Sequence, residues 1–427
     1  MATCKNVQNI GAIDCIGRGF ESCISTTYDH SLNDVNCTFC GQCIESCPTG
    51  ALHEKENIND VWAKLKDPDT FVVAQTAPSI RVALGEEFGM EIGTNVTGKM
   101  VSALKALGFD KVFDTNTGAD FTIMEEATEF VKRFKENDNL PMTTSCCPGW
   151  VRFAEMEYPE NLPHLSSCKS PHQMFGAVIK SYYAEKNNID PSKIYVVSVM
   201  PCIAKKYESQ REEMQVDGIR DVDSVITTRE LARMIKQANI EFDKLEDEVF
   251  DNPMGEASGA GAIFGVTGGV MEAALRTAYE LMTGEELQKL EFEDVRGAKG
   301  IKKATIQIGD KEVKVAVAHG LGNARKIMEE IKNGTADYSF VEVMACPGGC
   351  IMGGGQPIKN AKTRMTVDVR AKRAASMYSI DERSTIRKSH ENPILKKIYK
   401  DYIGKPGEHR AHELLHTYYT PMKEYRI

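Results

Sequence analysis

Three groups of cysteines, set among glycines and prolines far apart in the chain, have the spacing to bind a metal centre. They lie in the segments 144–150 (TSCCPGW), 200–208 (MPCIAKKYE) and 342–350 (EVMACPGGC), which together contain five thiols. Four thiolates can complete the ligand shell of an iron–sulfur cube or of a tetrahedral metal ion. The fifth thiol then stands beside a ligand of a redox metal, and such a thiol is a candidate for proton transfer.

A further cysteine run lies near the N-terminus. Cys37, Cys40, Cys43 and Cys47 follow the C-x2-C-x2-C-x3-C-P spacing of ferredoxin 4Fe-4S sites, and the Cys-Pro ending disfavours a zinc knuckle. The fourth ligand is open, because in two-cluster ferredoxins the last cysteine of each run binds the other cluster. Cys4 stands where a truncated first run would end. We expect Cys4 to complete the cube, with Cys47 as the alternative.

The three distal loops resemble, nearly residue for residue, the signature loops of the FeFe hydrogenases, and the similarity extends from about Cys4 to the C-terminus. The resemblance implies an H-cluster, in which a 4Fe-4S cube is bridged by a cysteine to a two-iron subsite with CO, cyanide and a dithiolate. Its ligands would be Cys147, Cys202, Cys346 and Cys350, with the sulfur of Cys350 as the bridge. The implied reaction is the reversible reduction of protons to H2. Electrons would pass through the single additional 4Fe-4S cluster, to or from ferredoxin or a similar carrier.

The same resemblance implies the contacts around the two-iron subsite and a need for dedicated maturation enzymes. The contact residues are Ala77, Pro78, Ser79, Met200, Lys205, Phe264 and Met344. A lysine beside an anionic cyanide makes a charge-assisted hydrogen bond. Thioether and aromatic side chains would keep water from the irons.

A proton must leave or reach a buried site of this kind through acid and base groups at hydrogen-bond spacing. The expected order is Cys146, water, Glu126, Ser166, Glu129 and Arg133. Glu126 and Glu129 are three residues apart on an expected helix and therefore share one face. Without the resemblance, a glutamate pair at this spacing is typical of a solvated helix face. His172 stands where relatives commonly have glutamine, which leaves its role open.

The elements that must position these residues alternate between strands and helices. Short β-branched runs occur at 71–74, 111–113, 194–199, 225–228, 313–318 and 340–344, each followed by a helical pattern. This order predicts an α/β fold with parallel sheets flanked by helices and a two-lobed catalytic domain. The cysteine loops follow strand ends, where open α/β sheets bind ligands. We expect a ferredoxin-like module at 1–60, the catalytic domain at 61–372 and a helical, small-subunit-like segment at 373–427.

Composition narrows the class of protein. The chain has 427 residues, 42% of them apolar, and a formal charge of −9 without a long basic run, which disfavours nucleic acid as the partner. No apolar stretch approaches the length that spans a bilayer, so we expect no membrane partner. Thirteen cysteines, most of them in short groups, favour metal ligation in a reducing compartment over disulfides. These features predict a cytoplasmic protein.

Several other signals carry less weight. Residues 412–416 read H-E-x-x-H, the zinc-protease motif, but no convincing third ligand follows. Cys15 and Cys23 are expected to be small packed residues, and Cys168 has no assigned role. An iron–sulfur assembly protein of the same superfamily is the rival function, but such proteins typically lack the spare thiol and the lysine, here Cys146 and Lys205. A third possibility is an H2 sensor or a subunit of a larger NADH-linked complex.

Overall fold

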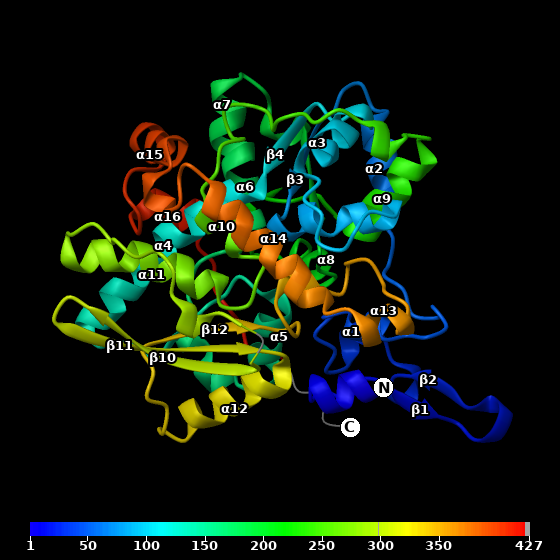
Figure 1. The fold of residues 1–427 in the computed structure, drawn as a ribbon, viewed down its shortest axis with the longest axis horizontal. Coiled ribbons are helices and arrows are strands. Elements are labelled where there is room, and N and C mark those ends of the chain that lie inside the picture. Colours follow the sequence, from blue (N-terminus) through cyan, green and yellow to red (C-terminus); the bar gives the residue numbers. More distant parts are fainter. Residues whose placement is uncertain (298, 423–427) are drawn as a thin grey trace.

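The long helix α4 (Thr115–Glu136) lies between two lobes, each built on a four-stranded sheet (Figure 1). The computed structural model describes residues 1–297 and 299–422. One side of α4 packs on α6 (Pro171–Val178) of the first lobe, and another side packs on α11 (Gly269–Thr283) of the second. Fourteen of its residues are buried, so this helix is a shared core element.

The first lobe contains an all-parallel sheet with the strand order β4-β3-β6-β9. The strands are β3 (Phe71–Thr76), β4 (Lys111–Asp114), β6 (Ile194–Met200) and β9 (Ser224–Thr227). β3 is buried from its second residue onward, as expected for a parallel strand covered on both faces. Its covering helices include α3 (Thr97–Ala106), α6 and α9 (Thr228–Gln237). The predicted parallel strands of this lobe are therefore confirmed.

The second lobe contains a mixed sheet with the order β10-β11-β12-β5. The strands are β5 (Met142–Thr143), β10 (Ile301–Ile308), β11 (Lys311–His319) and β12 (Phe340–Met344). β10 and β11 pair antiparallel through a two-residue turn in which Gly309 has φ of 60°. The structure thus adds an antiparallel edge strand to the predicted parallel ones. The sequence did not indicate β10, because this half-exposed strand has polar residues that hide its apolar ones.

In the second lobe, alternate residues of β11 face opposite sides of the sheet and pack into two different apolar layers. Val315 and Val317 of β11 belong to the core formed with α4 and α11. Ala316 and Ala318 belong to the core on the opposite face, formed with α5 (Pro148–Glu157) and α12 (Leu321–Lys332). Successive strand residues point to opposite faces, so one β-branched run serves both layers.

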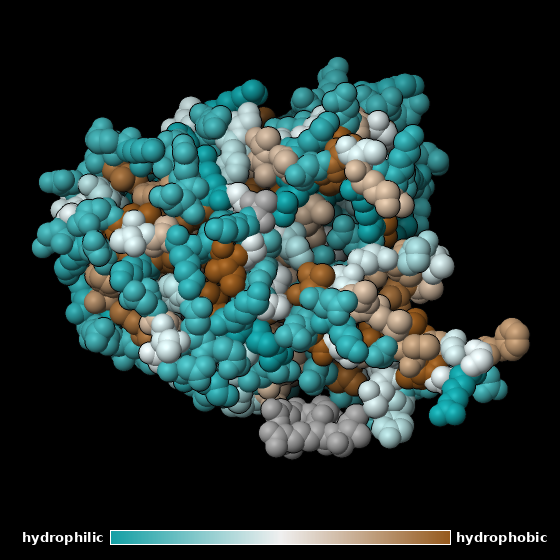
Figure 2. Space-filling view, turned by 60° about the horizontal axis from the view of Figure 1, so that its bottom comes forward, coloured by the Kyte–Doolittle hydropathy of each residue, from teal (hydrophilic) through white to brown (hydrophobic). Residues whose placement is uncertain are grey.

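The N-terminal module is small and carries a two-stranded hairpin, β1 (Asp14–Ile16) and β2 (Cys23–Ser25), which projects from the body (Figure 1). The hairpin also protrudes from the largely hydrophilic surface in Figure 2. Cys15 and Cys23 are exposed on these strands. The expectation that they are packed was therefore wrong, because a hairpin standing away from the body offers no core to pack into.

The C-terminal segment joins the cores of both lobes. Its helices are α14 (Val369–Arg383), α15 (Pro393–Ile398) and α16 (His409–Leu415). Asp381 pairs with Arg276 of α11 at 2.9 Å, and Arg373 pairs with Glu86 at 2.8 Å, all with buried side chains. Leu395, Leu414 and their neighbours belong to the core of the first lobe.

The remaining helices and strands are short or peripheral. They are α1 (Gln42–Glu45), α2 (Ile58–Leu65), α7 (Ala184–Lys186), α8 (Ala204–Glu208), α10 (Gly259–Ile263), α13 (Ala361–Thr366), β7 (Gln215–Val216) and β8 (Ile219–Arg220). Among the described residues, no helix combines the length and the apolar character needed to cross a membrane.

Candidate functional site

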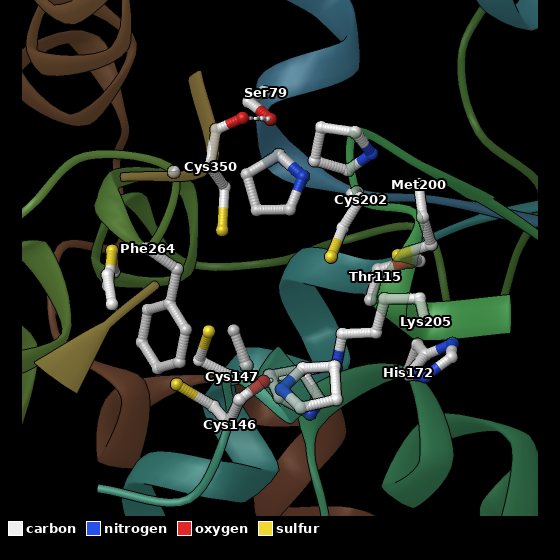
Figure 3. A pocket seen from close by; sticks show the side chains of 18 residues that line it. Ser79, Thr115, Cys146, Cys147, His172, Met200, Cys202, Lys205, Phe264 and Cys350 are labelled. Carbon is white, nitrogen blue, oxygen red and sulfur yellow. Dashed lines mark hydrogen bonds between the residues drawn. The ribbon is translucent and has the colours of Figure 1, made fainter. Parts of the chain in front are cut away.

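The ends of strands β3, β5, β6 and β12 open on one cavity between the lobes (Figure 3). Its empty volume is about 650 Å³. All seven residues predicted to contact a two-iron subsite line it, as do Cys146, Cys147, Cys202 and Cys350. Figure 3 shows the thiols of Cys202 and Cys350 directed into the same space, with Phe264 on one side and Lys205 on the other. The structure therefore brings these predicted residues together.

The four predicted ligand cysteines form a set that suits an iron–sulfur cube. Cys346 does not line the cavity, but its thiol is close enough to Cys202, Cys147 and Cys350 for their charges to raise its pKa further above the value set by burial. Burial likewise raises the pKa of Cys202 to about 12, with Cys147 adding to the shift. Four thiols within electrostatic range of one another are the donors that a cube prefers. The residues present therefore fit the implied group.

Glycine allows the loop after β12 to reach the cavity. Gly349 precedes Cys350 and has φ of 94°, and a Cβ at this position would lie 2.6 Å from the backbone nitrogen of Thr267. A larger residue would be strained and would clash with this backbone. The glycine therefore lets Cys350 approach the cavity from a tightly packed turn.

Lys205 is held in the cavity wall by a buried charge network. Its Nζ donates to Glu208 Oε2 at 2.9 Å and to the carbonyl of Cys146 at 3.0 Å. Burial alone would lower the pKa of Lys205, but Glu208 outweighs it and the pKa is raised. Lys205 therefore stays cationic, as an anion-binding role requires.

His172 shares the same carboxylate. Its Nε2 lies 2.5 Å from Glu208 Oε2, and its Nδ1 lies 3.1 Å from Ser198 Oγ. Burial, followed by the charge of Lys205, lowers the pKa of His172 to about 4. The imidazole is therefore neutral near pH 7 and donates one hydrogen bond to the carboxylate. Sequence reasoning missed Glu208, although its spacing of three residues from Lys205 on α8 was an available signal.

The predicted relay residues lie together beside the cavity. Ser166 Oγ donates to Glu129 Oε2 at 2.9 Å, and Arg133 Nη2 donates to Glu129 Oε1 at 2.6 Å. Neither carboxylate oxygen of Glu126 has a hydrogen-bond partner within the described part of the chain. Burial and the nearby Glu129 raise the pKa of Glu126 to about 8, so it holds a proton at neutral pH. Burial, with Glu126 next in importance, also keeps the Cys146 thiol protonated by raising its pKa.

At the N-terminal module, Cys4 approaches the cysteine run. Burial raises the pKa of Cys37 to about 11, and the thiols of Cys43 and Cys4 add to this shift. Cys4 also raises the pKa of Cys43, after burial. At Cys47, hydrogen bonds from Thr49 and from the backbone amide of Leu52 lower the pKa to about 6. Desolvation raises the pKa of the half-buried Cys40.

The H-E-x-x-H segment does not form a protease site. Helix α16 ends at Leu415, and His416 follows in an extended conformation. His416 Nε2 bonds instead to Glu125 of α4 at 3.0 Å, while Glu413 lies on the surface beside His409. The two histidines of the motif are therefore not a helical ligand pair.

Comparison with known proteins matches three family models to the chain. They are the iron only hydrogenase large subunit, C-terminal domain (residues 70–354), the iron hydrogenase small subunit (367–422) and a 4Fe-4S binding domain (32–53). The NADP-reducing hydrogenase subunit of Solidesulfovibrio fructosivorans is 52% identical over 97% of this chain and 71% of its own length. Iron hydrogenase 1 of Clostridium pasteurianum is 53% identical over 87% of this chain and 65% of its own length.

Solved structures and a second class of relatives are also similar. A FeFe hydrogenase of Chlamydomonas reinhardtii, solved as a variant, matches with a TM-score of 0.76 and 43% identity, over 86% of this chain and 99% of that one. The cytosolic Fe-S cluster assembly factor narfl of Xenopus tropicalis is 32% identical over 91% of this chain and 83% of its own length.

Proposed function

Because the chain belongs to the iron-only (FeFe) hydrogenase family, its reaction is the oxidation and evolution of H2 at an H-cluster, and we propose which of its residues carry that reaction. One further 4Fe-4S cluster serves electron transfer to and from a carrier. The observation that carries the assignment is the convergence of Cys147, Cys202 and Cys350 with Lys205 on one cavity.

We propose that Cys147, Cys202, Cys346 and Cys350 hold the H-cluster, with Cys350 as the bridge. When bound, the H-cluster supplies the redox centre at which protons and H2 interconvert. The ammonium of Lys205, kept charged and fixed by Glu208, would bind an anionic ligand of the cluster. Ala77, Pro78, Ser79, Met200, Phe264 and Met344 would wall the site and exclude water.

Side chains of the protein would carry protons between the cavity and the surface. Cys146 carries a neutral thiol at the cavity, and Glu126 is protonated at neutral pH, so each can give up and regain a proton. Ser166 donates to Glu129, and Arg133 holds Glu129 near the surface. Ser166 also opposes the rise in the pKa of Glu126, so we place this hydroxyl between the two carboxylates. The missing link is a step from Cys146 to the unpartnered Glu126 carboxyl, which we assign to a water molecule.

The fourth ligand of the N-terminal cluster is proposed to be Cys4, with Cys37, Cys40 and Cys43. This is supported by the mutual electrostatic influence of Cys4, Cys37 and Cys43, which Cys47 does not share in the described residues. The electron carrier is proposed to be ferredoxin or a similar protein, and dedicated maturation enzymes are proposed to supply the two-iron subsite. A reducing cytoplasm is the proposed location, since so many ligand thiols must stay reduced.

An assembly function like that of the more distant relatives is the second candidate. The presence of Cys146 and Lys205 at the cavity favours the enzyme. The deciding experiment is an anaerobic infrared spectrum of protein matured with the two-iron subsite, measured together with H2 evolution from reduced methyl viologen. CO and cyanide bands together with H2 production support the hydrogenase. Protein that carries iron–sulfur clusters but shows neither would support the assembly function.

A further inference from the structure

Glu129, Cys168 and His416 form a second group of metal-binding side chains, apart from the cysteines of the cavity. One ligand atom from each, an oxygen, a sulfur and a nitrogen, lies within 4.8 Å of the other two. Cys168 and His416 are buried, and the side chain of Glu129 is 15% exposed. Cys168 and His416 also pair through an isolated antiparallel bridge between their backbones. This pairing fixes the C-terminal segment beside the proton relay.

The imidazole of His416 is oriented as in a metal site. Its Nε2 bonds to Glu125 Oε2 at 3.0 Å, and its Nδ1 lies 2.8 Å from Ser167 Oγ. Glu125 is buried and is itself held by the amide of Gly407 at 2.7 Å and by the hydroxyl of Tyr399. Metal-binding histidines usually direct one nitrogen at a carboxylate, which sets the ring so that the other nitrogen can bind. Here that other nitrogen is Nδ1.

We propose that Glu129, Cys168 and His416 bind a divalent ion of the zinc type, and that this ion stops proton passage through Glu129. The mixture of sulfur, nitrogen and oxygen donors suits Zn²⁺. On binding, the S–H bond of Cys168 breaks, a metal–sulfur bond forms and the proton passes to solvent. A thiolate and a carboxylate then balance the two positive charges, and no electron is transferred.

The charges around the site favour a cation. Glu125, Glu126 and Glu129 all raise the pKa of Cys168, after burial, so the thiol is neutral until a metal replaces its proton. Arg133 opposes the ion, but it bonds to Glu129 Oε1, whereas Oε2 accepts from the weaker neutral donors Ser166, Ser167 and the thiol of Cys168 itself. Oε2 is therefore the oxygen available to the metal.

The site lies one side chain below the surface. The ring of the exposed His412 lies against the ring of His416, tilted by 37° with a centroid distance of 4.1 Å. The partly exposed side chain of Glu129 is the ligand that solvent reaches directly. Binding depends only on the three ligands, whereas the block of turnover rests on the proposed relay role of Glu129.

X-ray absorption at the zinc edge tests binding in the full-length, anaerobic holoenzyme with one equivalent of Zn²⁺. We expect one sulfur neighbour at about 2.3 Å and nitrogen or oxygen neighbours at about 2.0–2.2 Å. Cys168→Ser should lose the sulfur neighbour, and Cys168→Ala provides the same test without a new hydroxyl. His412→Asn and Cys23→Ser are the controls, and both should keep it. Zinc without a sulfur neighbour in the wild type, or with one that survives in both Cys168 variants, would overturn the site as adventitious surface binding.

Turnover with reduced methyl viologen, with and without zinc, tests the block. We expect zinc to lower H2 evolution at least tenfold, and Cys168→Ser to need at least tenfold more zinc for half inhibition. Each variant is compared with itself without zinc, so its basal activity does not affect the result. A bound zinc with the expected sulfur neighbour and unchanged turnover would overturn the block alone. A preparation that makes no H2 even without zinc would count against the proposed function, while the absorption spectrum would still decide the metal site.

Discussion

The sulfur of Cys346 lies 3.9 Å from the carbonyl oxygen of Cys40. A ligand loop of the catalytic domain thus contacts the ligand loop of the N-terminal module. Gly354 permits this approach, since a Cβ there would lie 2.5 Å from the same carbonyl. Arg152 adds a hydrogen bond to the carbonyl of Cys37 at 2.7 Å. We infer that electrons pass between the two clusters through this contact.

Removing the N-terminal cluster should therefore stop electron delivery by a protein carrier but not by a small dye. Cys40→Ala should abolish H2 production driven by ferredoxin, because the protein carrier cannot reach the catalytic cavity directly. H2 production with a small reduced dye should survive in part. Measuring both rates on one preparation makes the comparison, with the exposed Cys15→Ala as the control. Equal losses with both donors would show that the cluster is not the entry point.

The fourth ligand of that cluster can be decided by two single variants. Cys4→Ala should lose the 4Fe-4S signal in reduced-state electron paramagnetic resonance and about four iron atoms per chain. Cys47→Ala should keep both, because its thiol bonds to Thr49 and no other cysteine is among the groups that shift its pKa. The reverse pattern would show that Cys47 is the ligand.

Replacing the thiol of Cys146 should lower the rate of turnover without loss of the metal cluster. Cys146→Ser should keep the infrared bands and the iron content while H2 turnover falls by about a hundredfold or more, in the range expected for loss of a general acid–base group. A serine hydroxyl holds its proton too tightly to replace the thiol. Loss of iron with normal turnover of the remaining holoprotein would make Cys146 a ligand instead.

Replacing the carboxylates of the proposed proton relay should lower the rate of H2 evolution without changing the cluster. Glu126→Gln and Glu129→Gln should each slow H2 evolution by about a hundredfold or more with unchanged infrared bands. Glu136→Gln is the matched control, because Glu136 lies on the same helix and is exposed. Wild-type rates in both relay variants would make these glutamates structural.

The raised pKa of Glu126 also predicts how stability depends on pH. Between its ordinary value of 4.5 and about 8, the unfolded chain has lost this proton while the native state keeps it. Stability from Glu126 is thus fully present below the lower value and is lost as the pH rises through the upper one. Glutamine cannot ionise, so the Tm of Glu126→Gln relative to wild type should increase from about pH 5 to about pH 9. A constant difference in Tm would contradict the assigned pKa.

Glu208 should matter for stability as well as for the cavity. Glu208→Ala leaves the ammonium of Lys205 buried without its carboxylate, which should lower the free energy of unfolding by about 3–5 kcal/mol. Glu160→Ala is the control, because its pair with Lys332 is half exposed and screened by solvent, so its loss should have a much smaller effect. Anaerobic denaturant unfolding measures both variants. Similar losses in the two would show that the buried network adds nothing special.

The sequence predicted the site better than its surroundings. The cysteine loops could be placed because they follow strands, and strand ends meet at one sheet edge. The other cavity residues, such as Phe264 after helix α10, were implied only by the resemblance to the FeFe hydrogenases. β10 could not be found, since its polar residues on the exposed face mask the alternation. Glu208, placed by a contact within one helix, was within reach of the sequence. The grouping of Cys168 with His416 was not, because 248 positions separate them and only tertiary packing joins them.

The noncovalent contacts of the C-terminal segment indicate where the polypeptide can be split while the segment stays bound. Arg276 with Asp381, Arg373 with Glu86 and the apolar contacts of α15 and α16 join it to the body without covalent bonds. The peptide link passes through α13, which contains no buried residue. That link acts as a tether, which keeps the effective concentration of the segment high at its docking surface. A protein split within α13 keeps every buried contact, so two separately encoded polypeptides could assemble into the same enzyme.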